Sequence, residues 1–400
     1  MSRTLIRGSP LPTASRYAVA SRQEGDPEMP KSSKPEARDV KVGAVVRATF
    51  EPNSKQGSKF RLVASRLDGA TAPRVVLSND ERIRPGIPHL VRVLRVVESG
   101  AAHGHIEVEF VKVDLQLEGI YLDPGVSTRL QILLESGRNI LLDGPQGCGK
   151  TVLARAVAEQ LGMEFVFFNC SAVVESTDFL ATLQVRATPT GQPVTDFVKT
   201  ELLLALEEAG VNAGKRYLVF LDELNRCAES ARNVLMPGLD ATRRVYNPVV
   251  GAFLAIPENV QFVAAVNQGS IFTGTYGIDP AQLDRFAPVH LDYLPPEEET
   301  KLLGEGSPAV PTWIVRVLVQ AANLVRRSPD VAGGLSVRAT DEACTYLSHA
   351  LMAGDPAHHL PEVLKASFCG RFRGRWNDAG SDAGVVWEIV QGTPGLSLRA

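Results

Sequence analysis

The sequence predicts an α/β protein: a parallel sheet with helices on both faces, preceded by a small β domain and followed by a helical module. Three observations predict it. Short β-type runs separated by turn residues fill residues 41–116. Near-continuous apolar runs then alternate with helical periodicity over 117–293, the pattern of a parallel sheet covered on both faces. From Pro295 onward only helical patterns follow, as far as residue 376.

Composition argues against a membrane protein and against a protein held together by disulfides. The 400 residues carry a net charge of −3, which gives no general argument for nucleic acid or an anionic membrane as the main partner. No apolar run approaches the roughly 20 residues that span a bilayer, so we expect a soluble protein with no membrane partner. The five cysteines are scattered without CxxC spacing, which predicts reduced thiols in a cytoplasmic protein.

The first 40 residues differ from the rest. Residues 1–23 hold four arginines, several serines and threonines, and no acid. An organellar transit peptide has this composition. We nevertheless expect a disordered leader over 1–40, or upstream sequence read from an early start codon, because Met29 could itself begin the chain.

Residues 41–116 contain five short β-type runs broken by turn residues. The runs are Val42–Phe50, Phe60–Ala64, Arg74–Leu77, His89–Val97 and His105–Val111. Five short strands separated by turn residues predict a small barrel of the OB or SH3 type. Its phenylalanines, Phe50, Phe60 and Phe110, offer only a thin stacking platform for nucleic acid. A docking or spacer domain is therefore the favoured interpretation, and nucleic-acid binding is the alternative.

Five apolar runs mark the buried strands of the parallel sheet. They are Asn139–Leu142, Phe165–Phe168, Tyr217–Leu221, Gln261–Val266 and Pro288–Leu291. Helical periodicity fills the gaps between them. Four further helical stretches make up the module over 294–376, before a tail over 377–400: Pro296–Leu303, Thr312–Arg327, Thr340–Met352 and Pro361–Phe368.

The clearest motif is G-x-x-x-x-G-K-T, which directly follows a buried strand and opens an amphipathic helix. Its glycines let backbone N–H groups surround a triphosphate, and the helix N-terminus adds its positive end. Lys150 is expected to reach the β- and γ-phosphates, and Thr151 to hold Mg²⁺ through its hydroxyl. The predicted cofactors are ATP and Mg²⁺, although the motif does not distinguish adenine from guanine. The predicted nucleotide-binding residues are Gly144, Pro145, Gln146, Gly147, Cys148, Gly149, Lys150, Thr151 and Val152.

Two acids follow the apolar strand Tyr217–Leu221. Acids at the end of a buried strand are costly unless charge or water meets them. Asp222 fits a ligand of the magnesium ion, and Glu223 fits the base that orients the attacking water. A strand ending in a solvated turn is the alternative interpretation. The phosphate-binding motif in the same chain favours hydrolysis.

These motifs, with three others in the same order, resemble the AAA+ superfamily of P-loop ATPases, and within it the MoxR and dynein-related branch. Asp222–Arg226 resembles the branch's DEINR, and Ala265–Asn267 its sensor-1 strand. Gly274–Tyr276 and Gln282–Phe286 resemble GTYPLPEAQLDRF, and Leu335–Ala339 the sensor-2 motif. The resemblance covers roughly residues 117–351. It departs from the usual pattern at Gln268, at 277–279 and at Cys148.

The resemblance implies a role for each of three further residues. Asn267 would position the lytic water together with Glu223. Arg285 would enter a neighbour's nucleotide site as an arginine finger, which demands a homo-oligomer, by family precedent a ring of six. Arg338 would contact the γ-phosphate from the helical lid and couple hydrolysis to lid movement. For Arg285 and Arg338 alike, a solvated helix end is the alternative.

A hairpin pattern lies around Asn247-Pro248, within Leu239–Pro257. In the related branch, hairpins at this position face the central pore. Arg243 and Arg244 would then touch a threaded partner or an adjacent subunit. A solvated hairpin is equally consistent with the pattern.

The favoured function is ATP-driven remodelling of a protein client by a MoxR-like chaperone or activator. The alternative is a restriction-type motor, stimulated by nucleic acid, that grips DNA or RNA through the β domain. The basic and aromatic run Arg371–Trp376 lends it modest support. A scaffold that binds nucleotide and hydrolyses little is a third hypothesis, against which the Asp222–Glu223 pair and Arg285 argue. The sequence does not name the client.

Overall fold

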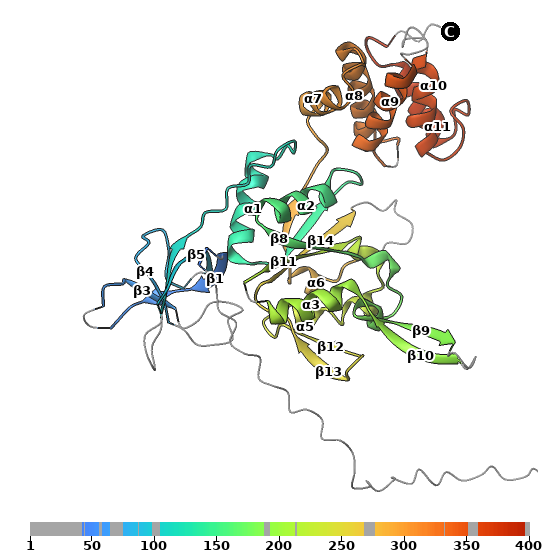
Figure 1. The fold of residues 1–400 in the computed structure, drawn as a ribbon. Helices are drawn as coiled ribbons and strands as arrows, with labels where there is room; N and C mark the ends of the chain where they lie inside the picture. The colour runs from blue at the N-terminus through green and yellow to red at the C-terminus, as the bar shows by residue number, and fades with distance from the viewer. Residues whose placement is uncertain are drawn as a thin grey trace, which may run out of the picture. The chain divides into compact units, whose positions relative to one another are not determined.

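The structure is a computed structural model (Figure 1). It describes residues 42–43, 45–55, 58–64, 75–86, 88–97, 105–187, 193–212, 214–267, 277–331, 333–350 and 359–396. All of them belong to one compact unit, Ala37–Ala400. The predicted leader over 1–40 lies outside the described residues, as do Gln268 and the Gly274–Tyr276 motif.

The N-terminal domain is a six-stranded sheet in the order β1-β5-β6-β4-β3-β2. Its strands are β1 (Val45–Thr49), β2 (Glu51–Pro52), β3 (Leu62–Ala64), β4 (Val75–Ser78), β5 (Pro88–Val97) and β6 (His105–Phe110). β4 and β6 pair in parallel, and the other neighbours are antiparallel. The edge strands β1 and β2 follow each other in the chain with only Phe50 between them, so the sheet curls back on itself.

One apolar core fills this domain. Every second residue of β1, β4 and β6 is buried in whole or in large part, because successive side chains of a strand point to opposite faces. Phe50 is fully buried in that core. The ring of Phe60 lies 5.9 Å from that of His105, and the ring of Phe110 lies 5.5 Å from that of His89. The phenylalanines considered as a stacking platform therefore contact their own domain.

The central sheet has five parallel strands in the order β15-β7-β14-β11-β8. They are β7 (Ile140–Gly144), β8 (Met163–Asn169), β11 (Arg216–Asp222), β14 (Val260–Asn267) and β15 (Ala287–His290). Each of the five predicted apolar runs overlaps one of these strands. The α/β prediction is thereby confirmed.

Helices cover both faces of this sheet. Tyr217, Val219 and Leu221 of β11 belong to one apolar cluster, and Leu218 and Phe220 belong to another. The first cluster includes α3 (Glu201–Val211) and α5 (Met236–Leu239), and the second includes α1 (Pro124–Ser136) and α2 (Lys150–Gln160). Alternate side chains of one strand thus reach opposite helical layers. The short helices α4 (Glu229–Arg232) and α6 (Pro280–Leu283) complete the described core.

Two antiparallel hairpins extend the core. β9 (Ala181–Ala187) pairs with β10 (Pro193–Lys199), and β12 (Arg244–Asn247) pairs with β13 (Ala252–Ala255). The second is the hairpin that the sequence predicts. The sequence pattern did not predict the first, in which Leu183, Val185 and Phe197 are exposed.

The C-terminal module contains α7 (Pro296–Gly306), α8 (Thr312–Arg327), α9 (Val337–Ala350), α10 (Leu360–Ser367) and α11 (Asp382–Gln391). The four predicted helices are present, and α9 begins earlier than predicted. The predicted tail over 377–400 requires correction, because α11 lies there. Its Val386, Trp387 and Val390 are buried in the same apolar cluster as α8. None of the described helices has the length and apolar character of a membrane span.

Candidate functional site

The predicted phosphate loop joins β7 to α2, which begins at Lys150. Gly147 and Gly149 adopt φ values of 76° and 93°, a backbone conformation that favours glycine. A Cβ atom at Gly144 would lie 2.2 Å from the carbonyl oxygen of Leu291. The loop conformation therefore needs glycine at these positions, which brings the backbone close to whatever the loop binds.

Lys150 is the buried cation of this loop, with 8% of its surface exposed. Its Nζ donates to the carbonyl oxygens of Gly144 (2.9 Å) and Pro145 (2.8 Å), and lies 3.8 Å from Cys148 Sγ. Burial lowers the pKa of Lys150, against attraction from Cys148, Asp222 and Asp143. A triphosphate would offer this ammonium group charged acceptors, which bond more strongly than neutral carbonyls.

The order of the strands brings the predicted residues to one edge of the sheet. Asn267 at the end of β14 is in register with Gly144 at the end of β7. β11 is the other neighbour of β14, and Asp222 is its last residue. The carboxyl ends of parallel strands are where ligands bind in α/β sheets. The loop, the acid pair and Asn267 therefore lie around the same edge.

The two acids differ in environment. Burial raises the pKa of Asp222, and the charge of Glu223 raises it further. The hydrogen bond from the Glu223 backbone N–H (3.0 Å) and the charges of Lys150 and Arg338 oppose this rise. Glu223 adopts left-handed backbone angles (φ 52°, ψ 42°), which are uncommon outside glycine and concentrate at functional sites. Its Oε2 lies 3.2 Å from Arg226 Nε. Arg226 is the last residue of the Asp222–Arg226 motif, and the sequence predicted no role for it.

The sequence patterns did not predict two further polar residues that lie at this edge of the sheet. Asn225 is 7% exposed, and its Nδ2 donates to the carbonyl oxygen of Asn267 (3.1 Å), which joins the turn after β11 to the tip of β14. Asp143 lies next to Gly144, with Oδ2 3.6 Å from His290 Nδ1. The available signal for Asp143 was an acid directly after the apolar run 139–142 and next to the glycine that opens the phosphate-binding motif.

Arg285 and Arg338 lie in different surroundings. Arg285 Nη1 donates to the carbonyl oxygen of Ala281, and Nη2 lies 4.0 Å from Asp240 Oδ2. Within the part of the chain that the structure describes, its side chain makes no hydrogen bond or ion pair with the phosphate loop. Arg338 is the second residue of α9, is exposed, and acts electrostatically on Asp222.

The two hairpin arginines have different environments. Arg243 has a left-handed φ of 41° and donates to the carbonyl oxygens of Ile256 (3.3 Å), Pro257 (2.8 Å) and Val260 (3.0 Å). It therefore closes the base of the hairpin, which corrects the expectation that it reaches a partner. Arg244 is exposed, with its guanidinium 4.9 Å from the ring centre of Phe253.

Replacing Arg243 by alanine should destabilise the protein. Bonds from charged groups contribute about 1.5–3 kcal/mol each, so Arg243→Ala is expected to lower the free energy of unfolding by at least about 2 kcal/mol. Arg244→Ala is the matched control and should change it by under about 1 kcal/mol, because the substitution removes an exposed contact with Phe253. Denaturant unfolding measures both, and equal effects would contradict the assignment of Arg243 to the base of the hairpin.

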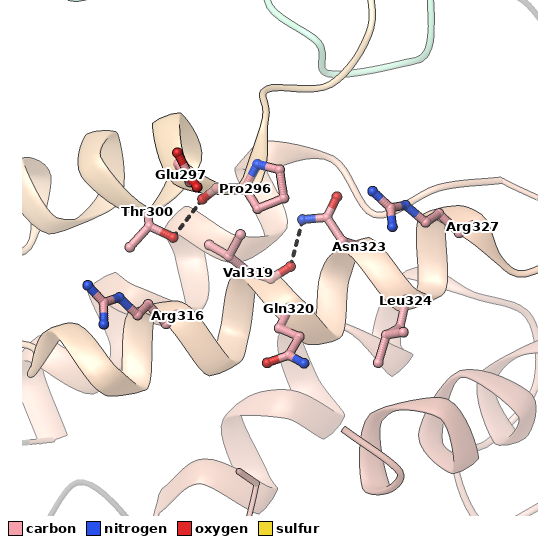
Figure 2. Close-up of a pocket in the computed structure, with 9 residues that line it drawn as sticks. All are labelled: Pro296, Glu297, Thr300, Arg316, Val319, Gln320, Asn323, Leu324 and Arg327. Carbon is pink, nitrogen blue, oxygen red and sulfur yellow. Dashed lines mark hydrogen bonds between the residues drawn. The ribbon is translucent and has the colours of Figure 1, made fainter. Parts of the chain in front are cut away.

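A surface hollow of about 490 Å³ lies elsewhere, between α7 and α8 of the C-terminal helical module, called the lid from here on (Figure 2). Among its lining side chains, Thr300 Oγ1 donates to the carbonyl oxygen of Pro296 (2.7 Å), and Asn323 Nδ2 to that of Val319 (2.9 Å). These polar groups bond to their own helices, and no phosphate-loop residue lines the hollow. The hollow is therefore separate from the candidate site.

Comparison with known proteins gives a match to one family model and several similar proteins. Residues 139–286 match the AAA domain of the dynein-related subfamily. Uncharacterized proteins of Staphylococcus aureus strains USA300 and NCTC 8325 are 28% identical over 172 residues, which are 43% of this chain and 62% of theirs. The chain thus spans less than two thirds of the length of these curated relatives.

Solved structures of Thermotoga maritima RuvB are also similar. The structure titled as the Holliday junction branch migration motor is 16% identical, with a TM-score of 0.38, covering 57% of this chain and 64% of that one. A mutant of the same protein is 14% identical, with a TM-score of 0.40, covering 60% and 69%. On the family match, the chain contains over residues 139–286 a domain similar to the AAA domain of the dynein-related subfamily, and the residues gathered at the edge of the sheet lie within it.

Proposed function

We propose that this chain hydrolyses ATP with Mg²⁺ in a homo-oligomeric ring, by family precedent a hexamer, and uses the energy to remodel a protein partner in the cytoplasm. One observation carries the hydrolytic part: Lys150, the Asp222–Glu223 pair and Asn267 come from separate elements and lie around one edge of the sheet. The remodelling role rests on the resemblance to the MoxR branch. The five cysteines are free, as the proposed compartment requires.

The loop fits a nucleotide. Its positive φ angles and the Lys150 ammonium group form the kind of cradle that binds phosphates. Among the described residues, no three His, Cys, Asp or Glu side chains are arranged to hold a metal ion. Mg²⁺ usually binds through one or two protein oxygens and the phosphates of its substrate. Thr151 and Asp222 are the proposed ligands.

We assign a role to each protein group from the resemblance to the AAA+ superfamily, and the positions given above are consistent with the roles of Lys150, Glu223 and Asn267. When bound, Mg²⁺ would offset charge on the phosphates. Lys150 would bind the β- and γ-phosphates, while Glu223 and Asn267 would orient the water. Arg285 would act on a neighbouring subunit, and Arg338 would act from the lid. The left-handed backbone at Glu223 and the contact of its side chain with Arg226 fix the position of the Glu223 carboxylate.

The aromatic and basic features offer little support for the nucleic-acid alternative. Trp376, in the basic run near the C-terminus, packs edge-on against Trp387 (5.8 Å between ring centres), and Lys365 Nζ lies 3.8 Å from its ring centre. Arg371 bonds to Glu342. In the β domain, the three phenylalanines contact their own domain. A protein client is therefore the preferred partner.

Mixing two inactive variants tests both the hydrolysis and the ring. The full chain should release phosphate from ATP with Mg²⁺ and stop when the metal is chelated. Arg285→Ala alone should be slower by about 10³-fold or more, the effect of losing an arginine finger, and Glu223→Gln should also be nearly inactive. A mixture should regain activity, because one subunit supplies the finger and its neighbour the base.

Two results would count against the proposal. Absence of any Mg²⁺-dependent hydrolysis by the wild-type chain would refute the enzymatic assignment. An active wild type whose mixed variants stay inactive would refute the role of Arg285 in a neighbour's site.

A further inference from the structure

The lid contains a buried ion pair that the proposed site does not use. Glu299 of α7 is fully buried, and the Arg326 side chain of α8 is 4% exposed. Arg326 Nη1 donates to Glu299 Oε2 (2.5 Å), and Nη2 donates to Oε1 (3.0 Å). Burying such a pair often stabilises a protein no more than apolar residues of similar volume. Stability alone therefore does not explain the pair.

The other bonds of this pair lead to the beginning of α9. Thr340 Oγ1 donates to Glu299 Oε1 (2.7 Å), and Arg326 Nε donates to the carbonyl oxygen of Leu335 (2.6 Å). Thr340 is itself fully buried. Leu335 and Thr340 lie on either side of Arg338 in the chain. The pair thus holds both flanks of the turn that carries Arg338.

The same arginine contacts the linker between β15 and α7. Arg326 lies 4.4 Å from the ring centre of Tyr293, in the range of a cation–π interaction. A Cβ atom at Gly334 would lie 2.6 Å from the Tyr293 hydroxyl oxygen, so linker and pre-α9 segment are in close contact. Burial raises the pKa of Tyr293, with Arg326 opposing and Cys148 of the phosphate loop adding to it. The linker is therefore part of the same network.

The beginning of α9 also borders the phosphate loop. A Cβ atom at Gly147 would lie 2.4 Å from Ser336 Cβ. Arg338 opposes the upward shift that burial causes in the pKa of Asp222, so its charge acts at that carboxylate. A small displacement of this turn would change where the Arg338 charge lies relative to the acid.

We infer that Glu299 and Arg326 are positioning residues, which together with Thr340 hold the first turn of α9 so that Arg338 is directed at the nucleotide. This inference rests on the proposed hydrolysis of ATP. Among the residues that the structure describes, neither side chain makes a hydrogen bond or ion pair with the phosphate loop, so both would act through Arg338. The alternative is that the pair only stabilises the lid.

A variant that keeps the packing but removes the polar bonds separates these explanations. Glu299→Leu/Arg326→Met replaces the pair by apolar side chains, so its melting temperature should equal or exceed that of the wild type. Its kcat for ATP should nevertheless fall roughly 10- to 100-fold, as when a reacting group is misplaced by about 1 Å. KM should change little, because binding through Lys150 is retained. A wild-type kcat in this folded variant would overturn the inference.

The dependence on Arg338 is tested by combining variants. If the pair acts through Arg338, adding Glu299→Leu/Arg326→Met to Arg338→Ala should not lower kcat further than Arg338→Ala alone does. Losses that multiply independently would overturn the inference. Glu342→Gln, which breaks the exposed ion pair with Arg371 in the same module, is the matched control and should leave kcat unchanged.

A milder substitution covers the case in which the double variant does not fold. Thr340→Val keeps the ion pair and removes one bond to Glu299. It should lower kcat severalfold, and not lower it further in the Arg338→Ala background. An unchanged kcat would overturn the inference. A wild-type chain that hydrolyses no ATP would refute the proposed function. A wild-type chain that hydrolyses ATP, together with variants of unchanged kcat, would refute only the inference about Glu299 and Arg326, so the two failures are distinguishable.

Discussion

Replacing Lys150 by alanine is expected to abolish ATP binding. The Lys150 ammonium group is buried, and its hydrogen bonds are to loop carbonyls that a triphosphate would outcompete. Hydrogen bonds to charged groups contribute about 1.5–3 kcal/mol each, and about 1.4 kcal/mol is tenfold in affinity. Loss of two such bonds should weaken binding by at least about 100-fold. Titration calorimetry with ATP and Mg²⁺ measures the change.

The matched control for that variant is Lys215→Ala. Lys215 is half-exposed and pairs with Glu164 (2.9 Å) and Glu208 (3.3 Å) at the surface, away from the loop. Its removal should leave the dissociation constant for ATP unchanged. Wild-type affinity in folded Lys150→Ala would show that the loop is not the phosphate site.

Replacing Glu223 by glutamine is expected to separate binding from hydrolysis. The amide keeps the size of the side chain but cannot accept a proton from water. General acid–base groups typically contribute about 10²- to 10⁴-fold in rate, so single-turnover hydrolysis should slow by that factor. The affinity for ATP should stay close to that of the wild type. Glu229→Gln, which changes an exposed acid of α4, is the control and should hydrolyse normally.

The same variant identifies the partner. Glu223→Gln with ATP should hold the ring in the ATP-bound state, so a pull-down should retain the client. Protein in the retained material would support remodelling, and nucleic acid without protein would favour the motor. Turnover near the wild-type rate would remove Glu223 from the mechanism.

The central sheet was predictable because its determinants are local. A strand buried on both faces reads as a continuous apolar run, and β7, β11 and β14 each satisfy that pattern. The parallel order then places the ends of neighbouring strands at one edge. The register of Asn267 with Gly144 is therefore the geometric counterpart of a pattern visible in the sequence.

Other features depend on contacts that no local pattern encodes. β9 exposes Leu183 and Val185, which leaves no clear alternation of buried and exposed residues. Arg243 is structural because three carbonyls from a later segment converge on it. Glu299 looks like one more acid in the first turn of a helix until the fold places Arg326 against it.

The packing of α11 predicts what removal of the residues after 376 would do to the helical module. Its apolar face packs on α8, the same helix that carries Arg326. Proteolytic removal of the residues after 376 would therefore expose apolar side chains of α8 to water. α11 would thus support α8, and with it the position of Arg326 in the proposed network.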